Sequence, residues 1–198
     1  MEVATDLFVR HGFAATSLID VARDAGVATR TLYQHFGDKE ALFREVIFAR
    51  DTGGFFQRPP IDATDALAEV LRRTALYAIE VTYRKRSINL MRLMIAESQR
   101  FPDLTRQVAM ATFSRFRRSV ASVFELLEQN GRIPAGDHAE SASLFIDFLL
   151  GSTPIMAYAA WSTSPPTDAE LDVKVDLFIL GRFGPEIAAN ARQALVEG

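Results

Sequence analysis

TSLIDVARDAGVATRTLYQHFGDK, residues Thr16–Lys39, is the stretch that decides the fold of this chain. Its first half carries apolar residues at i, i+3, i+4 and i+7, the spacing of one buried helical face: Leu18, Val21, Ala22 and Ala25. Ser17 followed by Asp20 predicts a capping box at the helix start. Gly26 stands where the helix ends and the chain needs a positive φ. The pattern predicts two short helices joined by a tight turn, the local form of a DNA-binding helix-turn-helix.

The second predicted helix, about residues 28–36, surrounds an apolar anchor of Val27, Leu32 and Phe36 with small polar groups, one guanidinium and one phenol. Such side chains suit a DNA groove better than a protein core. In an arbitrary protein, Tyr33 and His35 on a short helix are more often half-buried packing residues. The glycine turn before this helix and the lysine after it favour DNA binding.

Composition limits the classes of protein considered. The chain has 198 residues, 48% of them hydrophobic, so a sizeable core is available. The net charge of −3 argues only weakly against nucleic acid, because phosphate attraction depends on local charge within roughly 8–10 Å. The absence of cysteine excludes disulfides and thiolate metal sites, and no cofactor is expected.

The N-terminal residues, MEVATDLFVRHGF, lack the basic region and apolar run of a signal peptide, so a cytoplasmic location is expected. The first helix begins abruptly, without the first turn and polar tail expected ahead of it, and whether the sequence is trimmed at its start is an open question. Residues 142–161 are apolar with a single charge, Asp147, but they include Gly151 and Pro154. A buried helix of an all-helical protein explains this segment better than a membrane span, and no membrane partner is expected.

The whole chain shows helical periodicity, and the predicted fold class is all-α. A first helix ends at Gly12, and a linking helix covers about residues 38–51. Glycines and prolines at residues 52–54 and 58–60 indicate the one linker. Later helices are expected at residues 65–84, 88–99, 103–129, 137–160, 167–183 and 185–195, with capping boxes at Asp137/Glu140 and Thr167/Glu170.

The segment TSLIDVARDAGVATRTLYQHFGDKEALF resembles the N-terminal signature of the tetracycline-repressor (TetR) family of bacterial transcription regulators. The match is strongest over Phe8 to Val46, and its most specific part runs from Leu32 to Leu42. The segment LMIAESQRFPDLTRQV, Leu93 to Val108, resembles one subgroup of these regulators. The resemblance implies a three-helix DNA-binding domain at residues 1–46 and a helical ligand-binding and dimerisation domain at residues 47–198.

The same resemblance implies roles for individual residues. Ser17 would contact a phosphate, and Tyr33, His35 and Lys39 would bind the phosphate backbone of the DNA. Thr29, Arg30 and Thr31 would contact bases or the sugar-phosphate backbone. Gln34, on the same predicted helix, is a further candidate for a DNA contact that contributes to sequence preference. The chain departs from the family pattern at Ala28, where many relatives have serine, and at Arg30, where glycine is common. An arginine there can read guanine through two parallel hydrogen bonds.

The partners implied are a double-stranded DNA operator, a small-molecule effector of unknown identity and a second copy of the chain. An effector pocket is expected among the helices that begin near residues 65, 88, 103 and 138, with an apolar or aromatic ligand. Its candidate residues are Tyr77, Met91, Met94, Glu97, Phe113, Phe116, Phe148 and Trp161, with Asn89 and Arg92 as further polar contacts. A stripe of Met and Phe at helical spacing is more often plain core.

A homodimer is expected through about residues 138–183, since the last two long helices carry apolar residues on more than one face. These residues are Leu144, Phe145, Phe148, Leu149, Met156, Leu171, Val175, Phe178 and Ile179.

Two other classes of protein are alternatives to a DNA-binding regulator. An enzyme is disfavoured because the three histidines are far apart and no HExxH or GxSxG motif occurs. A helical scaffold without DNA binding is the second alternative.

Overall fold

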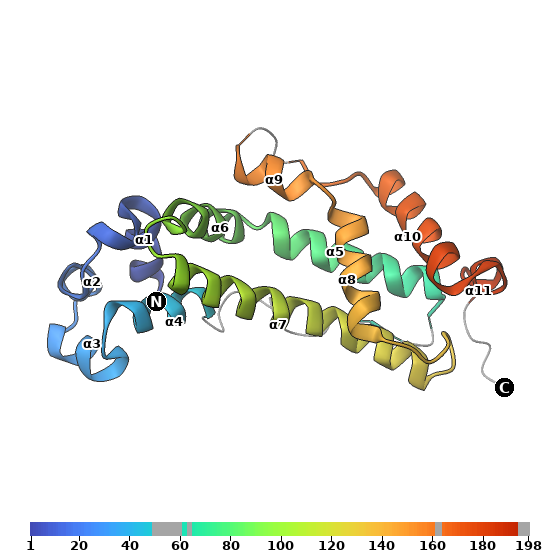
Figure 1. The fold of residues 1–198 in the computed structure, drawn as a ribbon, viewed down its shortest axis with the longest axis horizontal. Coiled ribbons are helices and arrows are strands. Elements are labelled where there is room, and N and C mark those ends of the chain that lie inside the picture. The colour runs from blue at the N-terminus through green and yellow to red at the C-terminus, as the bar shows by residue number, and fades with distance from the viewer. Residues whose placement is uncertain (49–60, 63–64, 161–163, 194–198) are drawn as a thin grey trace. The chain divides into compact units, whose positions relative to one another are not determined.

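The computed structural model describes residues 1–48, 61–62, 65–160 and 164–193. Every regular element in these ranges is an α-helix, so the predicted all-α fold class is confirmed (Figure 1). The helices are α1 (Glu2–Ala15), α2 (Leu18–Ala25), α3 (Thr29–Phe36), α4 (Lys39–Phe48), α5 (Leu67–Tyr83), α6 (Lys85–Glu97), α7 (Pro102–Gln129), α8 (His138–Leu150), α9 (Thr153–Tyr158), α10 (Asp168–Phe183) and α11 (Pro185–Asn190). None of the described helices is both long and apolar enough to cross a membrane. The predicted linker, residues 52–54 and 58–60, lies outside the described residues.

The helix expected to end at Gly12 is interrupted there, because Gly12 has a non-helical φ of 80° and ψ of 167°, and α1 continues beyond this kink to Ala15. The helix expected over residues 137–160 is two helices, since Gly151 ends α8 and Pro154 occupies the first turn of α9. The predicted capping box at Thr167 is present, whereas Asp137 makes only the half in which its carboxylate accepts the Glu140 N–H.

The described residues form two compact units. Unit 1 comprises the described part of Met1–Gly54 together with Lys85–Phe113, and unit 2 comprises the remaining described residues. Helix α6 and the start of α7 therefore pack with α1 to α4, whereas α5, α8, α9, α10 and α11 pack with the later part of α7. The domain boundary predicted between residues 46 and 47 stays a prediction.

An aromatic cluster fills the core of unit 1. Phe8 and Phe13 of α1 both pack edge-on against Phe43 of α4, with ring centroids 5.3 and 5.0 Å apart. Phe101, just before α7, packs on Phe13 at 4.8 Å. Leu18 and Val21 of α2 and Leu93 and Met94 of α6 complete the core. Helices α1, α2, α4 and α6 thus share one hydrophobic core.

Two polar contacts also join α6 to α1. Near the start of α6, Arg86 Nη2 donates to the Thr5 hydroxyl at 3.4 Å and to the Val46 carbonyl of α4 at 3.3 Å. At the end of α6, Glu97 Oε1 accepts the Phe13 N–H at 2.8 Å. The two contacts follow the same order in both helices, so α1 and α6 run parallel and are joined near both ends.

In unit 2, α5, α8 and α10 pack against one another around Phe124, Phe145 and Phe178. Lys174 of α10 donates to the Leu149 carbonyl at 2.7 Å, and Arg182 donates to the Ser141 hydroxyl at 3.0 Å. These bonds connect opposite ends of the two helices, so α8 and α10 are antiparallel.

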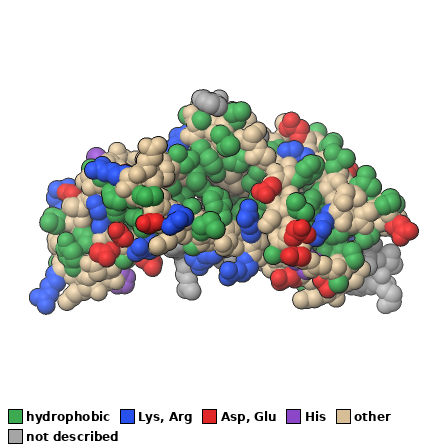
Figure 2. Space-filling view, viewed as in Figure 1, with side chains coloured by type: hydrophobic (Ala, Val, Ile, Leu, Met, Phe, Trp, Pro, Cys, Tyr) green, Lys and Arg blue, Asp and Glu red, His purple; other side chains and the backbone are tan. Residues whose placement is uncertain are grey.

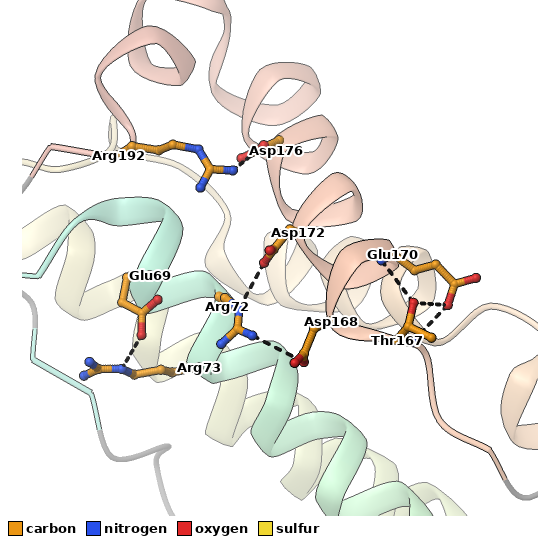
Figure 3. A network of polar contacts seen from close by, with 9 residues as sticks. All are labelled: Glu69, Arg72, Arg73, Thr167, Asp168, Glu170, Asp172, Asp176 and Arg192. Carbon is orange, nitrogen blue, oxygen red and sulfur yellow. Dashed lines mark hydrogen bonds and ion pairs between the residues drawn. The ribbon is translucent and has the colours of Figure 1, made fainter.

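Ion pairs fix α10 on its neighbours in unit 2 (Figure 3). Acidic residues recur every fourth position along one face of α10. Arg72 of α5 meets the first two, Asp168 at 3.3 Å and Asp172 at 2.9 Å. Arg192, which follows α11, meets the third, Asp176, at 2.6 Å. This face of α10 is therefore directed towards α5 and α11.

Candidate nucleic-acid interface

The start of α2 is fixed by the predicted capping box. Ser17 Oγ accepts the Asp20 N–H at 3.1 Å, and the Asp20 carboxylate accepts the Ser17 N–H at 3.3 Å and the Ser17 hydroxyl at 2.5 Å. These hydrogen bonds, with the charge of Arg23, outweigh partial desolvation and hold the pKa of the Asp20 carboxyl below its usual range. The Ser17 hydroxyl proton is thus already donated. A phosphate contact from Ser17 stays a prediction, and it requires this proton to turn away from Asp20.

A turn at Gly26 sets the direction of α3 after α2. Gly26 has φ 67° and ψ 29°, a left-handed conformation that a glycine adopts at little cost. The Val27 N–H returns to the Ala22 carbonyl at 3.0 Å, which satisfies a carbonyl at the end of α2. α3 then begins without any side-chain cap, because Ala28 has no hydroxyl to offer.

α3 keeps its polar side chains on the surface. No residue of this helix is buried; Leu32 and Phe36 pack partly against the core of unit 1. The side chain of Thr29 is intermediate in exposure, and those of Arg30, Thr31, Tyr33, Gln34 and His35 are exposed. Val27, expected to anchor the helix, is 42% exposed, and Leu32 and Phe36 are the residues of α3 that pack against the core of unit 1.

The guanidinium of Arg30 is free to meet an external anion. Arg23 of α2 is neutralised by Asp20 at 3.1 Å and Asp24 at 2.9 Å. In contrast, Arg30 forms no ion pair or hydrogen bond with any residue in the described ranges. The exposed face of α3 therefore presents an uncompensated positive charge beside hydroxyl and amide groups.

Lys39 has a structural contact in addition to its predicted DNA contact. Its ammonium donates to the carbonyls of Phe13 at 2.8 Å and Ala14 at 3.1 Å, and it lies 4.6 Å from the centroid of the Phe13 ring. These bonds satisfy carbonyls in the last turn of α1. One of the three ammonium donors is left for a phosphate, so the predicted backbone contact remains chemically possible.

The residues predicted to line an effector pocket belong to both units. In unit 1, Met91 and Met94 pack in the hydrophobic core. Glu97 accepts a hydrogen bond from the Phe13 N–H. Phe113, the last residue of this unit, is 44% exposed. In unit 2, Tyr77 and Phe116 pack in the core, and Phe148 is 44% exposed. Trp161 lies outside the described residues. Their contact with a ligand stays a prediction.

Apolar side chains are also exposed on unit 2. Leu144 and Phe148 are exposed on α8, as predicted for a second apolar face, whereas Phe145 and Leu149 are buried. α10 exposes Val173, Leu177 and Leu180, which the sequence interpretation overlooked although their i, i+4, i+7 spacing marks a helical stripe. Asp147 is exposed and lies 3.9 Å from Arg117. Figure 2 shows hydrophobic side chains, in green, reaching the surface among charged ones.

Comparisons with known proteins agree with this geometry. Residues 1–46 match the sequence model of bacterial regulatory proteins of the tetR family, and residues 69–179 match that of the C-terminal domain of AefR-like transcriptional repressors. The chain is 31% identical over 87 residues to the transcriptional repressor KstR2 of Rhodococcus jostii, an alignment covering 42% of this chain and 43% of that protein. The matches to the first curated relatives span less than half of those proteins.

Two solved structures are similar over most of the chain. A TetR-family transcriptional regulator from Mesorhizobium loti MAFF303099 is 29% identical with a TM-score of 0.69, and the match covers 91% of this chain and 93% of that one. The flavonoid-responsive regulator FrrA is 27% identical with a TM-score of 0.75, with the same coverage of 91% and 93%.

Proposed function

The chain belongs to the TetR family of bacterial transcription regulators, so we propose that it represses transcription as an operator-bound homodimer that a small molecule releases. As a member of this family it is a DNA-binding regulator and not an enzyme. The operator is palindromic in this proposal, because a two-fold dimer presents two equivalent recognition helices about 34–36 Å apart.

The observation that carries the proposal is the exposed polar face of α3. Its polar side chains form no hydrogen bond or ion pair with the described residues, which suits a helix that enters the major groove. Arg30 is the specificity contact, because a guanidinium that donates to O6 and N7 of guanine discriminates bases by about 1–3 kcal/mol. Thr29, Thr31 and Gln34 supply further base or sugar contacts, and Tyr33 and His35 supply phosphate contacts.

Ser17 and Lys39 are phosphate contacts at the edges of this surface. Lys39 contributes one remaining donor and its charge while it stays bonded to α1. Ser17 contributes a donor only if its hydroxyl leaves Asp20. We therefore rank Lys39 above Ser17 as a source of affinity.

The homodimer forms through α8 and α10. The exposed residues Leu144 and Phe148 of α8 and the exposed stripe of α10 support this interface, since apolar side chains in such rows are typical of buried surfaces. Lys174 and Arg182 hold the two helices antiparallel in one rigid pair. The pair can therefore present both rows to a second copy.

The effector is a small apolar or aromatic molecule. Similarity to a flavonoid-responsive regulator over nine-tenths of the chain supports a polycyclic aromatic compound of that kind. The effector lowers operator affinity only to the extent that it prefers a dimer in which the recognition helices have a different separation. In this proposal, α4 transmits the change from the effector site to the recognition helix. The hydrogen bond from Arg86 to the Val46 carbonyl links α4 to α6.

Selection of sequences bound by the full chain from a random DNA pool tests the proposal. We expect enrichment of a palindrome with half-sites one helical turn apart, and release of that DNA by a flavonoid. The Arg30→Ala variant, run in parallel, should lose preference at one position of each half-site. Enrichment of a single asymmetric site, or of nothing, would contradict a dimeric repressor.

A further inference from the structure

The Tyr83 hydroxyl, at the end of α5, is buried without a hydrogen-bond partner in the described part of the chain. The described residues contain two other such atoms, Arg86 Nε and His138 Nδ1. Each of those belongs to a group whose other nitrogen is bonded, Arg86 Nη2 to Thr5 and His138 Nε2 to Glu128. Tyr83 has one polar side-chain atom, and that atom has no partner.

A buried hydroxyl without a partner destabilises the protein that contains it. Such a group gives up its hydrogen bonds to water on folding and gains none in return, so buried polar atoms nearly always have partners. The ring of Tyr83 packs against the hydrophobic core of unit 2. A phenol without an internal partner in such surroundings suits a partner that binds from outside.

A second phenol lies near the first one. α9 packs on α5, and Tyr158 is the last residue of α9. Burial, and then the nearby Tyr83, raise the pKa of Tyr158 to about 12, so this phenol stays neutral and protonated at neutral pH. The Tyr83 hydroxyl therefore lies close to a second phenol that carries no charge.

We propose that the Tyr83 hydroxyl is the specificity contact of the effector site, and that it donates a hydrogen bond to a neutral carbonyl oxygen on an aromatic effector. This inference rests on the proposed ligand-responsive function and adds the chemical class of the ligand. A ketone matches the site because it accepts one hydrogen bond and carries no net charge. A carboxylate matches it less well, because a buried anion needs a cation and a phenol supplies none.

The test pairs one atom of the protein with one atom of the ligand. The protein variants are the wild type and Tyr83→Phe, which removes only the hydroxyl oxygen. The ligand probes are flavanone, which carries a ketone, and flavan, which carries a methylene group in its place. We expect the wild type to bind flavanone about 5- to 10-fold more tightly than flavan by calorimetry. Tyr83→Phe should bind the two probes equally within about twofold.

Tyr158→Phe is the matched control. It removes a phenol from the same contact between α5 and α9, and it should keep the preference for flavanone. If Tyr83→Phe also keeps that preference, or if the wild type binds neither probe, the inference is overturned. All three proteins should bind the operator equally without ligand. A failed ligand preference with intact operator binding would therefore contradict only the inference about Tyr83, whereas absent operator binding would contradict the proposed function.

A measurement without ligand decides the structural half of the inference. Removing a hydroxyl that has no partner should leave the melting temperature of the free protein unchanged or raise it. A lower melting temperature for Tyr83→Phe would show that the hydroxyl has a partner in the free protein, and it would overturn the inference whatever the binding data are.

Discussion

Removing the Glu97 carboxylate should destabilise the unit that contains the helix-turn-helix. In Glu97→Ala, the Phe13 N–H loses the Oε1 acceptor that lies 2.8 Å away, while Phe13 itself stays 3% exposed. A buried donor left without a partner costs about 1–3 kcal/mol of unfolding free energy. Glu97→Gln keeps an acceptor oxygen, so it should cost less, about 0.5–1 kcal/mol.

Gly12 supplies an independent route to the same contact. A Cβ added at Gly12 would lie 2.7 Å from Glu97 Oε1 and push the carboxylate away from the Phe13 N–H. The φ of 80° and ψ of 167° at Gly12 add strain of about 1–3 kcal/mol for a residue with a side chain. Because both changes break one hydrogen bond, Gly12→Ala and Glu97→Ala together should cost less than the sum of the two.

Urea unfolding of the three single variants and of the Gly12→Ala/Glu97→Ala double variant measures these energies, with the exposed Glu125→Ala as control. Equal loss in Glu97→Gln and Glu97→Ala would refute the argument, since the acceptor would then have no special role. Full additivity in the double variant would refute the shared contact. Operator affinity of Glu97→Ala should also fall, because α1 packs on α2, whose turn carries α3.

Four substitutions and one titration test other parts of the structure and of the proposed DNA interface. Arg30→Ala should relax specificity at one operator position, whereas Lys39→Ala should weaken all sequences alike and lower the salt slope by about one; uniform loss for Arg30→Ala in titrations over operator variants would contradict this. NMR titration should place the pKa of the Asp20 carboxyl below its ordinary 3.8, so that the α2 cap is fully formed above that pH and is lost as pH falls through the lower folded value; a pKa at or above 3.8 would contradict it. Arg72→Met should cost about 0.2–1 kcal/mol per lost ion pair, and the loss should shrink at 1 M salt if it is electrostatic. Leu177→Glu should convert the dimer into a folded monomer by light scattering, since 52% of this side chain is exposed within one copy; a persistent dimer would place the interface elsewhere.

Local sequence signals predicted the helix-turn-helix well. The capping box at Ser17, the left-handed Gly26 and the exposed polar face of α3 depend on residues within four positions of one another. Short-range hydrogen bonds and helical periodicity are sufficient to specify such features, so they can be predicted from the local sequence. The missing cap at Ala28 was predictable for the same reason.

Features that depend on distant residues were not predictable from the pattern. Glu97 was interpreted as a possible ligand contact, because nothing near it in the sequence points to the Phe13 N–H. Lys39 was interpreted only as a phosphate contact, because its bonds to the end of α1 arise from tertiary packing. The break after Gly151 was missed since the surrounding residues keep an apolar helical pattern on both sides of it. The buried Tyr83 hydroxyl has no local sequence signal either.

The contact between Gly12 and Glu97 also restricts how this chain can evolve. An alanine at position 12 is strained by the φ of 80° in any case, and beside an acid at position 97 its methyl group would in addition lie 2.7 Å from the carboxylate oxygen. An acid at position 97 has its acceptor role only while position 12 is glycine. We therefore expect these two positions to change together among orthologues, so their covariation in an alignment would reveal the α1–α6 contact without a structure.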